Sequence, residues 1–94
     1  MPRLNWSPKF AREYKRFARR NPQLRPLIER TLRLLAEDPR HPALRTHKLK
    51  GELADVWSCS IDYNTRILFE FAEDSESNEI IIGLLRLGVH DDVY

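Results

Sequence analysis

Histidine and arginine are the residue types in this sequence best suited to proton transfer and anion binding. The imidazole group titrates near neutral pH and can act as an acid or a base, and the guanidinium group matches the oxygens of phosphate. His47 lies in a basic run, Arg45-Thr-His-Lys-Leu-Lys50, and His90 lies near the end of the sequence. Such residues could cleave a phosphodiester bond by acid–base chemistry. A single histidine in a basic loop is more often a solvated surface residue, so residue type alone does not assign this role.

The spacing of possible metal ligands argues against a metal site. The three histidines, His41, His47 and His90, show no paired spacing such as His-x-x-x-His. The pair Asp91-Asp92 beside His90 is more typical of a solvated turn than of a ligand set. Because Cys59 is the only cysteine, a site built from several thiolates cannot form. We therefore expect no metal ion and no cofactor.

Cysteine usage and hydropathy bear on where the protein works. A single cysteine permits no intramolecular disulfide, which is typical of a reducing compartment. No apolar stretch approaches the roughly 18 residues that a transmembrane helix needs. The first residues run directly into charged ones rather than into an export signal. These features predict a cytoplasmic protein.

The charges are divided unevenly along the 94 residues. Residues 1–50 hold 14 Lys and Arg against 4 Asp and Glu, whereas residues 51–94 hold 2 against 10. The basic half could provide a surface for a polyanion, because phosphates reward clustered basic side chains through counterion release. Alternatively, helix surfaces are simply basic and strand edges acidic.

Hydrophobic spacing predicts a short strand and then two helices. Residues 4–6 alternate as in a strand, and Ser7-Pro8 supplies a helix cap followed by a proline at the first helical position. This helix should end near Asn21-Pro22. A second helix should begin somewhere between Asn21 and Pro26 and end at Asp38-Pro39, with its apolar stripe packed against the first helix.

The second half of the chain reads as strands. Residues 39–53 are expected to form an irregular loop, because they contain two prolines, a glycine and the basic run. From residue 54 the apolar period becomes two, which predicts a hairpin with a turn at residues 62–65 and then a central strand over Glu79–Leu87. The fold class is α+β in the order β-α-α-β-β-β, with 1–94 as one domain and the helical hairpin on one face of a mainly antiparallel sheet. By parity, Arg66 faces away from the apolar face, on an open side of the sheet.

Three local patterns resemble the RelE/ParE toxin superfamily, and more narrowly its YafQ-type (RelE/StbE-type) members. The first is His47-Lys-Leu-Lys-Gly51, and the second runs from Trp57 through Asp62 to Arg66-Ile-Leu-Phe69. The third, and the most specific, is the closing Leu87-Gly-Val-His-Asp-Asp-Val-Tyr94. The resemblance covers the whole chain, because the order of the expected elements also agrees.

The resemblance implies which residues form the site. His47, His90, Tyr94 and Arg66 match the catalytic positions, with the histidines serving as acid and base, although which does which is open. Asp62 and Asn64 are possible accessory residues, and the implied RNA-binding residues are Arg45, Lys48 and Lys50. The sequence departs from the pattern at two positions. Ser60 and Asn64 stand where some YafQ-type toxins have a histidine and an aspartate.

The resemblance also implies a function and partners. The family's members are typically endoribonucleases that cleave messenger RNA, often on the ribosome, and that a cognate antitoxin inhibits. Metal-independent cleavage would use the 2′-hydroxyl as nucleophile, with a base, an acid and a phosphate-binding group supplied by the protein. Two alternatives remain: a ParE-like inhibitor of DNA gyrase that has no catalysis of its own, and a degenerate toxin that only binds its antitoxin.

Overall fold

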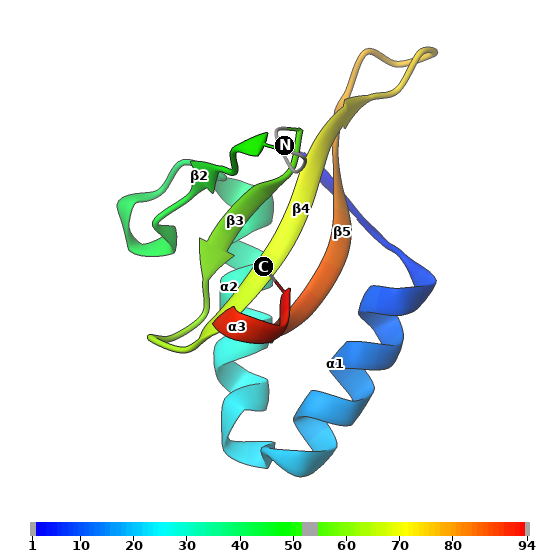
Figure 1. Cartoon of the computed structure of the whole chain (residues 1–94). Coiled ribbons are helices and arrows are strands. Elements are labelled where there is room, and N and C mark those ends of the chain that lie inside the picture. The colour runs from blue at the N-terminus through cyan, green and yellow to red at the C-terminus, as the bar shows by residue number, and fades with distance from the viewer. Residues whose placement is uncertain (1, 52–54, 94) are drawn as a thin grey trace.

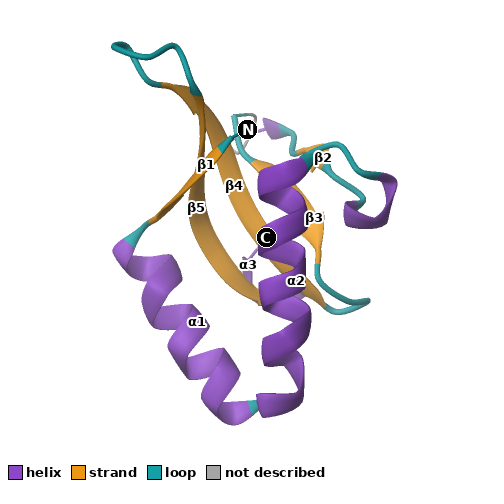
Figure 2. Cartoon of the chain, turned by 180° about the vertical axis from the view of Figure 1, so that it is seen from behind, coloured by secondary structure: helices purple, strands orange, loops and turns teal. Residues whose placement is uncertain are grey.

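The computed structural model describes residues 2–51 and 55–93. The described chain forms a five-stranded sheet in the order β1-β5-β4-β3-β2, with two long helices on one side of it. A short C-terminal helix lies on the other side (Figure 1). Seen from behind, α2 crosses β3 and β4 while α1 runs beside β5 (Figure 2). Within this described part, no helix is long and apolar enough to cross a membrane.

The helices begin and end where the sequence predicts. The helix α1 spans Pro8–Arg20, and the Ser7 Oγ atom accepts a hydrogen bond from the Phe10 amide at 3.0 Å. The region between Asn21 and Pro26 uses both possible starts. A 3₁₀ turn, η1, covers Pro22–Leu24, and α2 then spans Arg25–Glu37. Proline fixes φ and lacks an amide hydrogen, so each proline suits the first turn that it occupies.

The strands contain one element that the sequence analysis missed. The sheet consists of β1 (Arg3–Trp6), β2 (His47–Lys48), β3 (Trp57–Ser60), β4 (Thr65–Glu73) and β5 (Ile80–Val89). The expectation of an irregular loop over residues 39–53 is wrong in part. That segment contains the 3₁₀ turn η2 (Pro42–Leu44) and the edge strand β2, which pairs with β3. Two residues are too few to show an alternating pattern, so only the pairing reveals this strand.

One face of the sheet and the helices share an apolar core. Cys59 of β3 lies opposite Ile67 of β4, and both are fully buried. They pack in one cluster with Phe10 of α1 and with Ile28 and Leu35 of α2. Burial raises the pKa of the Cys59 thiol to about 12. Cys59 is therefore a protonated core residue.

A β-bulge in β5 changes which side chains face the core. Leu68 pairs with Arg86, but the next residue, Phe69, pairs with Leu84, so Leu85 is the extra residue. As a result Leu84 and Leu87 are both buried, although they are three positions apart. Simple alternation over residues 79–87 would place these two side chains on opposite faces.

The opposite face of the sheet is not fully open, contrary to the sequence-based expectation. The helix α3 (His90–Val93) folds onto it across β4 and β5 (Figure 1). Leu68 is 3% exposed and Val93 is 5% exposed, so both apolar side chains are covered. An apolar residue on the second face needs such cover, and four residues are too few for the sequence pattern to predict a helix.

Candidate active site

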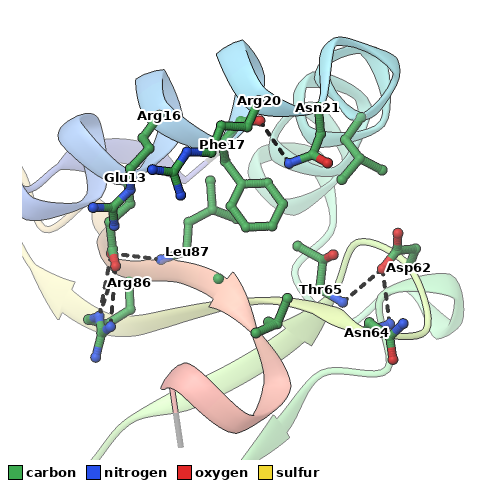
Figure 3. Close-up of a pocket in the computed structure, with 13 residues that line it drawn as sticks. Glu13, Arg16, Phe17, Arg20, Asn21, Asp62, Asn64, Thr65, Arg86 and Leu87 are labelled. Carbon is green, nitrogen blue, oxygen red and sulfur yellow. Dashed lines mark hydrogen bonds and ion pairs between the residues drawn. The ribbon is translucent and has the colours of Figure 1, made fainter.

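The turn between β3 and β4 is shaped by the carboxylate of Asp62. Its Oδ1 atom accepts hydrogen bonds from the amide of Asn64 at 3.0 Å and from the amide of Thr65 at 2.7 Å (Figure 3). The Ile61 amide also donates to the Thr65 carbonyl at 2.9 Å. Asp62 and Asn64 therefore lie where the sequence predicts a turn, and Asp62 has a structural role there.

Arg66 follows this turn, and the turn holds its guanidinium group. Its Nη1 atom donates to the carbonyl of Asp62 at 2.6 Å and to that of Thr65 at 3.2 Å. Arg66 pairs with Ser60 across the sheet and alternates with buried Ile67, so it lies on the face predicted from parity. Its Nε and Nη2 atoms form no hydrogen bond with any residue in the described ranges. The anchored side chain thus keeps donors for a further anion.

Arg45 and Arg66 line the same cavity. This cavity of about 280 Å³ lies at the end of β3 and is also lined by Ser60, Asp62 and Tyr63. Arg45 sits there in a left-handed backbone conformation, with φ of 51° and ψ of 41°. Such a conformation costs a non-glycine residue about 1 kcal/mol or more and is concentrated at functional sites. A small cavity lined by two arginines is suited to a phosphate.

His47 lies on β2, opposite Ser58 of β3, and its side chain is exposed. Its Nδ1 atom is 3.1 Å from the carbonyl oxygen of Arg45. Because a carbonyl only accepts, this contact requires the proton on Nδ1, which leaves Nε2 of the neutral ring as a proton acceptor. The backbone contact thus fixes the orientation of the His47 ring.

His90 is exposed and begins α3 at the end of β5. Val89 pairs with Thr65, and the His90 amide donates to the Asn64 carbonyl at 2.8 Å. The main chain of His90 is therefore fixed beside the β3–β4 turn and close to Arg66. Tyr94, the remaining predicted catalytic residue, lies outside the described residues.

The predicted residues form two groups, those that line the Arg45–Arg66 cavity and those that lie outside it. Neither His47 nor His90 is among the residues that line the Arg45–Arg66 cavity. His47 is two strands from β4, and a strand spacing of 4.7–4.9 Å puts it roughly 10 Å from that strand. Lys48 and Lys50 are exposed and form no ion pair with any residue that the structure describes. An extended substrate could bridge these groups, whereas a small molecule could not.

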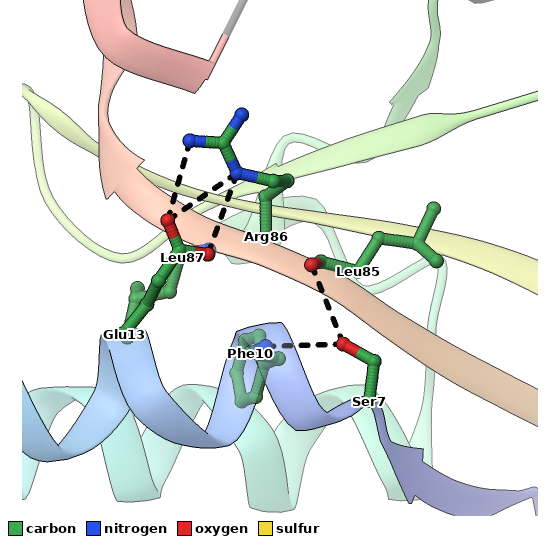
Figure 4. Close-up of polar contacts among 6 residues, drawn as sticks. All are labelled: Ser7, Phe10, Glu13, Leu85, Arg86 and Leu87. Carbon is green, nitrogen blue, oxygen red and sulfur yellow. Dashed lines mark hydrogen bonds and ion pairs between the residues drawn. The ribbon is translucent and has the colours of Figure 1, made fainter.

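Two residues around the site were not singled out from the sequence. Tyr63 is 87% exposed at the tip of the β3–β4 turn, although it lines the Arg45–Arg66 cavity. Glu13 of α1 is only 7% exposed, and its carboxylate accepts from Arg86 Nη2 at 3.2 Å and from the Leu87 amide at 3.0 Å (Figure 4). Glu13 thereby binds a main-chain amide on the edge of β5 where β1 no longer pairs with that strand. An aromatic residue within a predicted turn was a usable signal for Tyr63, but sequence offers none for Glu13.

The described part of the chain contains no group of three or more His, Cys, Asp or Glu side chains that could hold a metal ion. His47 lies on β2, which pairs with β3, whereas His90 follows β5, which pairs with β4. The two histidines therefore come from different parts of the sheet.

Comparison with known proteins assigns the chain to a family. The model of the bacterial YafQ toxin of type II toxin–antitoxin systems matches residues 2–94. This chain belongs to the YafQ toxin family. The assignment to YafQ-type toxins from three sequence patterns is thus confirmed. No curated protein sequence matches the chain significantly.

Solved structures of toxins share this YafQ-family fold. A YoeB/ParE toxin from Agrobacterium tumefaciens has a TM-score of 0.77 at 19% identity, covering 94% of this chain and 98% of its own. A metal-bound toxin from Helicobacter pylori has a TM-score of 0.75 at 25% identity, covering 100% of both chains. The E. coli DinJ–YafQ complex gives 0.74 at 11% identity, covering 100% of this chain and 99% of the other. The predicted α+β class, with helices packed on a mainly antiparallel sheet, is confirmed.

Proposed function

We propose that this YafQ-family toxin is an endoribonuclease that cleaves messenger RNA without a metal ion. The observation that carries the proposal is the cavity lined by Arg45 and Arg66, with the ring of His47 held by the carbonyl of Arg45. The two arginines bind the phosphate at which cleavage occurs and stabilise the charge that develops on it. Binding an RNA strand rather than a small ligand accounts for the spread of the site over three strands.

The residue roles follow from the chemistry of 2′-hydroxyl attack. One side chain removes the 2′-hydroxyl proton and another donates a proton to the departing 5′-oxygen. The carbonyl contact of His47 favours it as the base, which leaves His90 or Tyr94 as the acid. Arg66 holds the phosphate, and Asp62 supports Arg66 through the turn rather than by transferring protons.

Three further residues extend the contact with RNA. Lys48 and Lys50, which flank Leu49 after His47, bind the phosphate backbone without reading its sequence. Tyr63 stacks on a base next to the bound phosphate, because its exposed ring lines the same cavity as Arg66. Ring stacking tolerates any base, so Tyr63 adds affinity rather than specificity.

The partners proposed are a cognate antitoxin and messenger RNA on the ribosome, in the cytoplasm. The E. coli YafQ in the comparison was solved in complex with DinJ. An acidic antitoxin segment would cover the basic surface around Arg45 and Arg66, which keeps RNA out of the site.

The test is cleavage of a messenger RNA by the purified full chain in EDTA, with and without ribosomes. We expect products that end in a cyclic phosphate, and a large loss of kcat in His47→Ala and His90→Ala with little change in unfolding free energy. His41→Asn is the matched control, because His41 only caps η2 by accepting from the Ala43 amide at 3.1 Å, which asparagine can also do.

Absence of cleavage by folded wild-type protein in both settings contradicts the proposal. Cleavage that appears only when a metal ion is added back contradicts the metal-independent form of the proposal. Adding metal back is a necessary control, because one of the similar Helicobacter toxins was solved with a metal bound. Inhibition of DNA supercoiling that survives His90→Ala would favour the gyrase-binding alternative.

A further inference from the structure

A second and larger cavity lies on the other side of the β3–β4 turn. Its volume is about 690 Å³, and it is bounded by the C-terminal half of α1, by the turn and by the end of β5 (Figure 3). The residues that matter here are Arg16, Phe17 and Arg20 of α1, Asn64 of the turn, and Leu87 and Val89 of β5. None of them belongs to the catalytic set proposed above, apart from the accessory position Asn64.

The charge of this cavity favours an anion. Arg16 and Arg20 lie one helical turn apart, are exposed, and form no ion pair with any residue in the described part of the chain. The third arginine in the lining, Arg86, is already paired with Glu13 at 3.2 Å. The remaining carboxylate, that of Asp62, accepts from two backbone amides. Arg16 and Arg20 are therefore the groups available to an incoming phosphate.

The rest of the lining offers contacts for a nucleobase. Phe17 and Leu24 from the helical side and Leu87 and Val89 of β5 add apolar patches to a lining that is mainly polar. Asn21 donates through its Nδ2 atom to the Phe17 carbonyl at 3.3 Å, which leaves its side-chain oxygen to accept from a base. The volume falls within the range of about 300–1,000 Å³ that is typical of small-ligand sites.

The two cavities adjoin each other. Asp62 lines both of them, and Arg66 and Asn64 stand on either side of the turn that separates them. A single RNA strand that crosses this turn would place one phosphate at Arg66 and a neighbouring nucleotide against α1. An antitoxin segment would satisfy the arginines equally well, but the combination of two arginines unpaired within the described residues, side-chain amides and apolar patches fits a nucleotide better than a peptide carboxylate.

We infer that this second cavity is a subsite for an RNA nucleotide that flanks the cleaved one, with Arg16 and Arg20 binding its phosphate. The inference rests on the proposed function. Occupancy of the subsite fixes the register of the strand and adds affinity that a very short RNA cannot gain.

The test measures binding of uncleavable RNA by fluorescence anisotropy. Fully 2′-O-methylated oligonucleotides of three and of nine residues are titrated into the full chain at several salt concentrations. The variant is the double substitution Arg16→Gln/Arg20→Gln. Its control is Arg12→Gln/Arg19→Gln, which removes the same charge from exposed positions of the same helix outside the cavity. Arg16→Lys/Arg20→Lys restores charge without the planar fork.

We expect wild-type protein to bind the nine-residue RNA more tightly than the three-residue RNA. The Arg16→Gln/Arg20→Gln variant should lose about tenfold more affinity for the longer RNA than the control variant loses. The slope of log binding constant against log salt concentration should become shallower by about 1.4, since two phosphate contacts are lost. Affinity for the shorter RNA should not change. The lysine variant should recover part of the loss.

Equal losses in the two glutamine variants would overturn the inference, while cleavage by wild-type protein would leave the proposed function intact. Unchanged RNA affinity together with weakened antitoxin binding would assign the cavity to the protein partner and also overturn it. If wild-type protein binds neither RNA at any salt concentration, the proposed function fails as well.

Discussion

Gly88 of β5 lies directly beneath Val93 of α3. A Cβ atom at position 88 would stand 2.9 Å from Val93 Cγ1, a distance that real Cβ contacts essentially never show. Gly88 is also the cross-strand partner of Arg66. The absence of a side chain at this position therefore lets α3 settle on the sheet beside Arg66, with His90 at its first residue.

Gly88→Ala should destabilise the protein by about 1–3 kcal/mol, because the branched Val93 side chain has little rotamer freedom to move away. The RNA cleavage rate should fall as well, since α3 carries His90. Gly83→Ala in the same strand is the control. Its Cβ would meet only the exposed, flexible side chain of Glu70 at 3.2 Å, so a gain of about 0.5 kcal/mol is expected. Urea denaturation of both variants measures the difference, and equal effects would contradict this account of Gly88.

Glu13→Ala should cost about 2–4 kcal/mol of unfolding free energy. The substitution removes the buried carboxylate that pairs with Arg86 and leaves the Leu87 amide without this acceptor. Glu29→Ala removes the exposed pair with Arg25, whose atoms are 3.5 Å apart, and should cost less than about 1 kcal/mol. Glu13→Gln should lie between the two, because its amide oxygen can still accept from Leu87. Chemical denaturation that ranks Glu29→Ala above Glu13→Ala would refute this reading.

Asp62→Asn should keep both the stability and most of the cleavage activity, whereas Asp62→Ala should lose about 1–2 kcal/mol and most activity. Asparagine retains a side-chain oxygen that can accept from the amides of Asn64 and Thr65. The turn carbonyls that hold Arg66 then stay in place. An inactive but fully stable Asp62→Asn protein would instead show that the carboxylate transfers protons.

Ser60→His should raise the cleavage rate by roughly 10²-fold, which is the lower range for a positioned acid or base. Ser60 is the cross-strand neighbour of Arg66 and lines the same cavity, so an imidazole there would reach the bound phosphate. Ser60→Asn, which adds a polar group without a titratable one, is the control. Single-turnover cleavage rates compare the two variants, and a similar rate in both would show that a histidine at position 60 has no role in cleavage.

The stability should fall above about pH 9 because of Cys59. Burial raises the pKa of this thiol from 9.0 to about 12, so the unfolded chain loses the proton first. A raised pKa in the folded state means that the contribution is fully present below pH 9 and is lost as the pH rises toward 12. Denaturation at pH 8 and pH 10 should differ by about 1 kcal/mol more in wild-type protein than in Cys59→Ala. Parallel pH profiles would contradict the prediction.

The helices and the main strands could be predicted because their signals are local. Ser7-Pro8 begins α1, and the two prolines between residues 21 and 26 begin η1 and α2 in turn. The bulge at Leu85 could not be predicted, since an extra residue in an apolar strand leaves the hydrophobic pattern unchanged. The same holds for β2 and α3, which are defined by their partners rather than by their own few residues.

The sequence indicated where some of the proposed site residues would lie but not how they are arranged. Strand parity placed Arg66 correctly, because the turn and the apolar period fix which way it points. The shared cavity with Arg45 depends on η2 folding against the end of β3, a contact between distant segments. The contact of Glu13 with Leu87 joins residues 74 positions apart, so no local pattern reports it.

The parallel pairing of β1 with β5 also decides when the sheet can be completed. The first strand reaches its neighbour across almost the whole chain, as the contact between Ser7 and Leu85, 78 positions apart, shows. Such high contact order slows folding, because a long loop must close before the contact forms. Until β1 docks, the apolar stretch Ile80–Ile82 presents an unpaired strand edge that can recruit another chain. Self-association of this protein should therefore compete with docking of its first few residues, and deleting those residues should make it aggregate.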